Sequence, residues 1–126
     1  MRLPHPVPEL PVDDVTGAGE SYGRQMGFAV DWTFEDVRAG ISRDDARIFL
    51  RRRTAEETRA RYSVLIWLNM DSAVEVDELH AEWKGRGALI VEDLRTAPYN
   101  LREFTAQDAD GNRIRVFHDL GTSSGS

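Results

Sequence analysis

Cysteine is absent from this sequence. The chain therefore forms no disulfide, has no thiolate nucleophile and cannot bind zinc through sulfur, and we expect it in a reducing cytoplasm. No apolar run approaches the roughly 18 residues that a membrane-spanning helix needs. Residues 1–10 also lack the apolar core of a signal peptide. These absences predict a soluble protein without a membrane partner.

The sequence also has no excess of positive charge. It contains 16 basic and 22 acidic residues, so its formal net charge is −6. This balance disfavours binding to nucleic acid and favours positively charged ligands through a long-range, salt-sensitive attraction. The length of 126 residues suits a single domain, which we place at 1–119. The remaining stretch, 120–126, is rich in Gly and Ser and is typical of a flexible tail.

The first half of the chain predicts a strand, a helix and then three strands. Within 13–27, an Asp near the start is a suitable N-cap and Gly27 is a suitable C-cap. Glycines inside this helix lower its intrinsic stability, so we expect it to depend on docking to a sheet. Asp44-Asp45 suits the turn before the last strand. The four strands are predicted within 7–12, 28–36, 39–44 and 46–52.

The second half repeats this order. An Asp-capped helix over 71–87 ends at Gly87, which occupies the same place in its half as Gly27 does in the first. The strands of this half are predicted within 62–70, 89–95, 101–107 and 112–118.

This repeated order predicts an α+β fold of two βαβββ modules, at about 4–52 and 62–119. We expect curved mixed sheets with the helices on their outer face, which leaves the other face of each sheet available to a ligand. The charged stretch 51–62 between the modules alternates in sign, and we interpret it as a solvated linker.

The stretch 105–119 carries Asp or Asn at every second position from Asp108, as the start of a calcium-binding loop does. Such a loop needs Gly at its sixth position and a bidentate Glu at its twelfth, where this chain has Arg113 and Asp119. The pattern therefore fails as a calcium site. We interpret Asp110-Gly111 instead as a two-residue hairpin turn with positive φ angles.

Alternation along the strands separates an aliphatic face from an aromatic one. Trp67, which we expect on a central strand, points away from Ile66 and Leu68. Phe49 shares its face with Arg47 and Arg51, and Phe117 shares its face with Arg113 and Arg115, in each case opposite the aliphatic neighbours. Aromatic side chains with polar neighbours suit either a ligand pocket or a subunit interface, and the pattern does not separate the two.

Trp32 and Phe34 raise a different expectation. By strict alternation they share a face with Phe28 and Val30, so we expect part of this set in the core.

The stretches "EDVRAGISRDDARIFL", "VDELHAEWK" and "LREFTAQDADGN", together with the doubled βαβββ plan, resemble the bleomycin-resistance proteins of the vicinal-oxygen-chelate superfamily. This superfamily also contains glyoxalase I and the extradiol dioxygenases, and the resemblance covers residues 7–118. It implies a homodimer, formed by domain swapping, with two hydrophobic clefts that hold flat, cationic glycopeptide drugs and withhold them from DNA. The function it implies is non-enzymatic sequestration of a bleomycin-like small molecule, with no cofactor.

The metal enzymes of the superfamily bind their ion through four inward-facing ligands, and the resemblance places these positions at Val7, Phe49, Leu65 and Arg115. None of these side chains is a metal ligand, so we expect neither a metal nor catalytic residues. His5, His80 and His118 are interpreted as surface or packed histidines.

Three alternatives stay open. One is a metal-dependent lyase or isomerase of the glyoxalase type, and another is a dimeric binder of a different small molecule. The third is a structural or regulatory dimer with no small ligand. A reaction without a metal would need a base, for which Glu103 and Glu9 are the candidates. The ligand-binding residues expected from alternation and from the resemblance are Trp32, Phe34, Phe49, Trp67, Tyr99, Asn100, Arg115 and Phe117.

Overall fold

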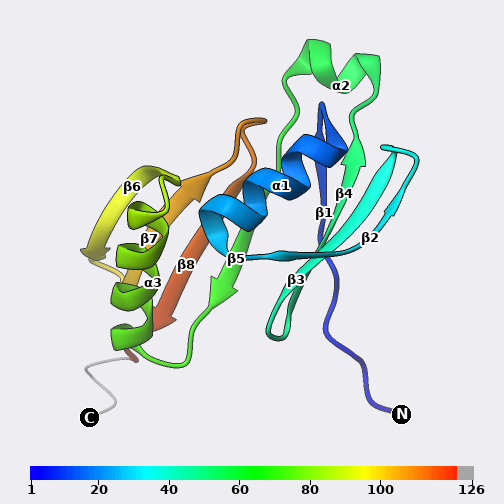
Figure 1. Ribbon diagram of the computed structural model, residues 1–126. Coiled ribbons are helices and arrows are strands. Elements are labelled where there is room, and N and C mark those ends of the chain that lie inside the picture. Colours follow the sequence, from blue (N-terminus) through cyan, green and yellow to red (C-terminus); the bar gives the residue numbers. More distant parts are fainter. Residues whose placement is uncertain (122–126) are drawn as a thin grey trace. The chain divides into compact units, whose positions relative to one another are not determined.

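The computed structural model describes residues 1–121, which form two compact units, the first spanning Met1–Val64 and the second beginning at Leu65. Each unit contains one four-stranded mixed sheet and one long helix (Figure 1). The expected α+β fold of two βαβββ modules is therefore confirmed. The predicted tail at 120–126 lies mostly outside the described residues. Within residues 1–121, no helix is long and apolar enough to cross a membrane.

In the first unit the strand order is β1-β4-β3-β2, with β1 parallel to β4 and the other pairs antiparallel. The helix α1 packs on β2, β3 and β4. Asp44 and Asp45 form the two-residue connection between β3 and β4, because Arg43 pairs directly with Ala46. The elements are β1 Glu9–Val12, α1 Val15–Met26, β2 Ala29–Phe34, β3 Arg38–Arg43, β4 Ala46–Arg52 and α2 Ala55–Ala60.

The ends of α1 follow the predicted signals. The Asp14 side chain accepts a hydrogen bond from the Gly17 backbone at 3.0 Å, and Gly27 closes the helix with a φ of 77°. The helix glycines also allow close docking, because a Cβ added at Gly19 would lie 3.2 Å from Val30 Cγ2 on β2. Glycines that weaken the isolated helix therefore bring it close to the sheet.

In the second unit the order is β5-β8-β7-β6, again with one parallel pair, β5 and β8. The helix α3 packs on β6, β7 and β8, and its Trp83 meets Phe104 edge to face at 5.7 Å. The elements are β5 Leu65–Asn69, α3 Ala73–Gly85, β6 Leu89–Thr96, β7 Leu101–Gln107 and β8 Arg113–Asp119.

One expectation about the helices was incomplete and another was wrong. The stretch 51–62 has no buried residue, as suits a solvated linker, but it also contains α2, which starts with a capping box between Thr54 and Glu57. The N-cap of α3 is Ser72, whose hydroxyl accepts from the Glu75 backbone at 3.1 Å, rather than the preceding Asp71.

The hairpin between β7 and β8 is confirmed, but its two-residue turn is not. The last strand pair is Gln107 with Arg113, and within the connection 108–112 only Gly111 has a positive φ. The Asp108 Oδ1 atom accepts from the backbone of Asp110 and Asn112 at 2.8 and 2.9 Å. The alternating Asp and Asn residues therefore close a longer loop through their own hydrogen bonds.

Candidate functional site

Each sheet has one face against its own helix and one face of aromatic and charged side chains. In the first unit, Val30 and Ile41 pair across β2 and β3 and lie on the α1 side. We call the opposite side the first aromatic face. It carries Trp32, Phe34 and Phe49, together with Glu9, Arg38, Arg47 and Arg51.

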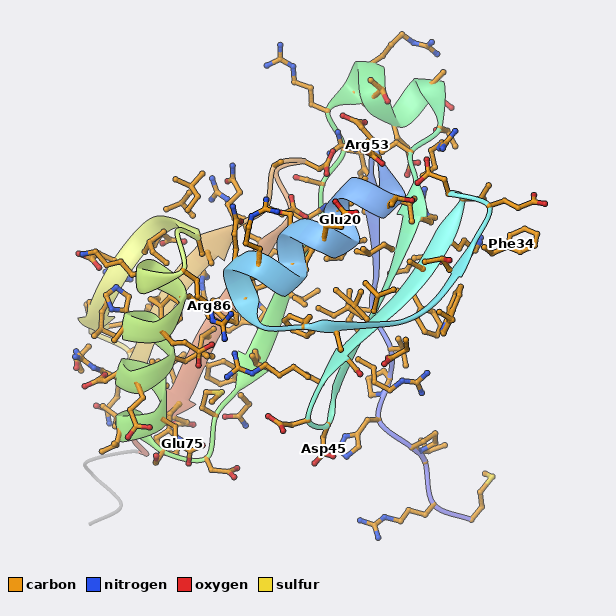
Figure 2. All side chains as sticks on the ribbon, in the orientation of Figure 1. Glu20, Phe34, Asp45, Arg53, Glu75 and Arg86 are labelled. Carbon is orange, nitrogen blue, oxygen red and sulfur yellow. The ribbon has the colours of Figure 1, made fainter. Side chains whose placement is uncertain are left out.

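The centre of the first aromatic face is an edge-to-face pair between Trp32 and Phe49, with ring centroids 5.3 Å apart. Gly40 on β3 is the cross-strand neighbour of both Trp32 and Phe49, and its lack of a side chain makes room for the Trp32 indole. The guanidinium of Arg47 lies 5.6 Å from the centroid of the Phe49 ring. Figure 2 shows the Phe34 side chain projecting outward at the end of β2.

The expectation that Trp32 and Phe34 share a face with Val30 was wrong, although part of the set does lie in the core, because Phe28 is only 6% exposed. The register of β2 against β3 shifts between Val30 and Trp32, where a β-bulge inserts one extra residue. Beyond the bulge, Trp32 and Phe34 point away from α1, although Val30 points toward it. Both aromatic side chains are therefore exposed and neither belongs to the core.

A chain of ion pairs borders the first aromatic face. The Glu9 carboxylate binds Arg38 at 2.6 Å and Arg51 at 2.9 Å. Arg51 also holds Glu57 of α2 through two hydrogen bonds of 2.6 and 2.7 Å. The hydrogen bonds from Arg51, with help from the Thr54 backbone, lower the pKa of Glu57 to about 2.

We call the side of the second sheet that points away from α3 the second aromatic face, and its centre is built like that of the first. Phe104 on β7 contacts α3, so its neighbours Glu103 and Thr105 point to the opposite side. On that side Trp67 and Phe117 form an edge-to-face pair with centroids 5.3 Å apart. Trp67 is 49% exposed. Its strand, β5, forms an edge of the sheet, which corrects the expectation of a central strand.

Arg115 connects Trp67 to the polar part of this face. Its guanidinium lies 4.8 Å from the Trp67 ring centroid, donates to the Thr105 hydroxyl at 3.1 Å and binds Glu92 at 2.6 Å. The hydrogen bond from Arg115 lowers the pKa of Glu92. The carboxylate therefore stays ionised and keeps the guanidinium in place over the ring.

A second polar group surrounds Glu103, which is only 3% exposed. Its Oε2 atom accepts from the Tyr99 hydroxyl at 2.6 Å and from Arg95 Nε and Nη2 at 3.3 and 3.2 Å. The hydrogen bonds that Arg95 donates to the Tyr99 hydroxyl and to the Glu103 carboxylate raise the pKa of Arg95. Alternation places Glu103 on this face, but its partners depend on the register and could not be predicted.

The structure thus distributes the predicted ligand-binding residues over two surfaces. Trp32, Phe34 and Phe49 lie on the first aromatic face. The second aromatic face carries Trp67, Arg115 and Phe117. Tyr99 lies in the turn before β7 and reaches the Glu103 carboxylate of that face. Asn100 differs, because it has a positive φ of 68° in the turn between β6 and β7 and its side chain donates to the Gly121 carbonyl.

The histidines lie away from both aromatic faces or before the first strand. His80 Nε2 contacts Asp93 at 2.9 Å, and His118 Nδ1 contacts the Met70 carbonyl at 2.8 Å. Of the four positions that the resemblance assigns to metal ligands, Phe49, Leu65 and Arg115 lie on strands and carry side chains unsuited to a metal. Among residues 1–121, no group of three or more His, Asp or Glu is placed to hold an ion.

Residues 2–116 match the sequence model of the Glyoxalase/Bleomycin resistance protein/Dioxygenase superfamily. The chain belongs to this superfamily. No curated protein matches it in the sequence search.

Solved structures share the superfamily fold at low sequence identity. A bleomycin-binding protein complexed with bleomycin superposes with a TM-score of 0.77 at 17% identity, covering 93% of this chain and 99% of that one. The bleomycin-binding protein of Streptomyces verticillus, complexed with copper(II)-bleomycin, gives 0.74 at 24% identity, covering 97% and 99%. A superfamily member from Nocardioides gives 0.75 at 16% identity, covering 98% and 88%.

Proposed function

We propose that this superfamily member is a non-enzymatic binding protein that sequesters a planar, cationic small molecule of the bleomycin class. The observation that carries the proposal is the pair of aromatic faces. Each has a tryptophan and a phenylalanine in edge-to-face contact, on the side of the sheet opposite its own helix. Exposed aromatic rings in such a pattern suit stacking with a flat ligand.

The energetics agree with a stacked ligand. Stacking a planar ring on an aromatic side chain contributes about 1–3 kcal/mol per ring, by analogy with nucleobases. Arg115 is itself a flat cation, and its position over Trp67 supports the idea that this ring accepts a flat, positively charged group. The formal net charge of −6 adds a long-range attraction for such ligands.

We propose further that the protein acts as a homodimer in the cytoplasm, with the domain-swapped arrangement that the sequence resemblance implies. Phe34 and Trp67 are 58% and 49% exposed in the single chain. Large exposed apolar side chains, which are present here on each aromatic face, mark an interface or a ligand site, and a cleft between two chains would serve as both.

Titration of the purified protein with copper-free bleomycin tests this function. We expect an increase in melting temperature and a change in tryptophan fluorescence. A ligand at 100 times its Kd should stabilise the folded state by about 2.7 kcal/mol. The absence of binding at millimolar bleomycin would reject the sequestration proposal.

Metal analysis of the same preparation separates this proposal from the enzymes of the superfamily. We expect no stoichiometric nickel, zinc or iron after dialysis. Retained metal that is lost on substitution of a residue of an aromatic face would favour a glyoxalase-type enzyme instead.

A further inference from the structure

Glu103 has one carboxylate oxygen that no described residue uses. The Oε2 atom accepts three hydrogen bonds from Tyr99 and Arg95, whereas the Oε1 atom is buried and has no hydrogen-bond partner among residues 1–121. Buried acceptors are nearly always paired, because an unpaired one has lost its hydration without compensation. An unused carboxylate oxygen is therefore unexpected unless it has a role.

The position of Glu103 connects this oxygen to the second aromatic face. Glu103 pairs across the sheet with Phe117, which is in contact with Trp67, and on its other side with Arg95. Tyr99, whose hydroxyl holds the Oε2 atom, is 54% exposed. The carboxylate therefore lies on the same side of the sheet as the Trp67 and Phe117 rings, and a flat ligand stacked on the exposed part of this face lies beside Glu103.

The chemistry of the site specifies what that edge must carry. A carboxylate is an acceptor only, and Arg95 and Tyr99 orient it by occupying its other oxygen. A hydrogen bond from a cationic N–H group to an ionised carboxylate is stronger than one between neutral groups. An amidinium or a protonated amino-heteroaromatic ring supplies such a donor in the plane of the stacked ring.

We propose that Glu103 is the specificity-determining residue of the second aromatic face, and that its Oε1 atom accepts a hydrogen bond from an in-plane N–H donor of a planar cationic ligand. This inference rests on the proposed binding function and adds the chemical class of the ligand. On the alternative interpretation, Glu103 serves only to fix Arg95 and Tyr99.

Two fluorescent planar cations test the inference. The diamidine 4′,6-diamidino-2-phenylindole carries amidinium N–H donors, whereas thioflavin T has no N–H group. We expect wild-type protein to bind both probes, and to bind the diamidine more tightly by about 10- to 100-fold, as a hydrogen bond to a charged group provides.

Glu103→Gln is the decisive variant. The Gln amide oxygen can keep the hydrogen bonds from Tyr99 and Arg95, so that its NH₂ group takes the place of Oε1 and replaces an acceptor with a donor. We expect the diamidine to lose about 10- to 100-fold in affinity. Thioflavin T should change by less than about threefold. Asp93→Asn removes the same charge beside His80 and measures the purely electrostatic contribution.

The outcomes separate the two proposals. If both probes bind wild type equally and Glu103→Gln affects them alike, the stacking function stands and the role of Glu103 is rejected. If wild type binds neither probe, both the stacking surface and the role of Glu103 are rejected. If Glu103→Gln does not fold, the comparison of the two probes is made on wild type at about 1 M salt, where screening removes the long-range advantage of the second positive charge of the diamidine and the hydrogen bond remains. Equal affinities at this salt concentration would reject the role of Glu103.

Discussion

Trp67 is the residue whose substitution best distinguishes a ligand surface from a core. It lies on an edge strand, is half exposed and contacts Phe117 and Arg115 through its ring. We expect Trp67→Ala to weaken binding of bleomycin by about 1–3 kcal/mol, measured by calorimetry. The loss of stability should be smaller than the 3–5 kcal/mol or so that truncation of a fully buried aromatic costs.

Val74→Ala is the matched control for Trp67→Ala, because Val74 is also exposed but lies on α3. It should leave bleomycin binding unchanged. If Trp67→Ala instead lowers the melting temperature severely while the folded fraction binds normally, Trp67 has a structural role and the second aromatic face is not the binding surface.

On the first aromatic face, Gly40 is the residue whose substitution best tests the position of the Trp32 ring. A Cβ at this position would overlap the Trp32 indole, coming within 2.7 Å of Cε2. We expect Gly40→Ala to displace Trp32 from Phe49 and to change the tryptophan fluorescence spectrum. If the first face binds ligand, affinity should fall by up to about 1–3 kcal/mol, the contribution of one stacked ring.

Gly85→Ala provides the comparison, because a Cβ added there meets no atom within 4 Å. It should change neither fluorescence nor affinity. An unchanged spectrum in Gly40→Ala would mean that the indole does not lie over Gly40 in solution.

At the scale of elements, α2 is held to the first sheet by the ion pair between Arg51 and Glu57. The folded-state pKa of Glu57 is about 2, below the ordinary value of 4.5. A depressed carboxylate pKa stabilises the folded state at pH values above the unfolded pKa, and this stability is lost as the pH falls through the folded pKa. The contribution of Glu57 should therefore decline from about pH 5 to about pH 2.

Thermal melts of wild type and Glu57→Gln over this range measure the effect. Near neutral pH the variant should melt at the lower temperature, and the difference should vanish as Glu57 becomes protonated in wild type. Glu56→Gln, a change at an exposed neighbour on the same helix, should differ little from wild type at any pH. A difference between wild type and Glu57→Gln that is constant with pH would show that the ion pair does not hold α2.

At the scale of the whole molecule, the proposed homodimer is open to direct measurement. We expect light scattering at micromolar concentration to give about twice the chain mass of 14.3 kDa. Dilution should increase the exposure of tryptophan to a soluble quencher if the aromatic faces take part in the interface. A single monomeric species at every concentration would contradict the dimer and require each chain to bind its ligand alone.

The sequence alone determined the order of the strands and of the two long helices, but not α2, because caps, turns and alternation are local properties. Asp14, Gly27 and Asp44-Asp45 have the positions expected of them, and β7 spans the predicted range. The aromatic character of the faces around Phe49 and Phe117 also followed from alternation.

Only the tertiary structure decided which side chains meet. The bulge before Trp32 reversed the direction of that residue, and the strand order placed Trp67 at an edge. The hydrogen bonds of Glu103 join β6, β7 and the turn between them. Such features depend on register and on partners from other strands, whereas alternation within one strand specifies a face and not the neighbours on it.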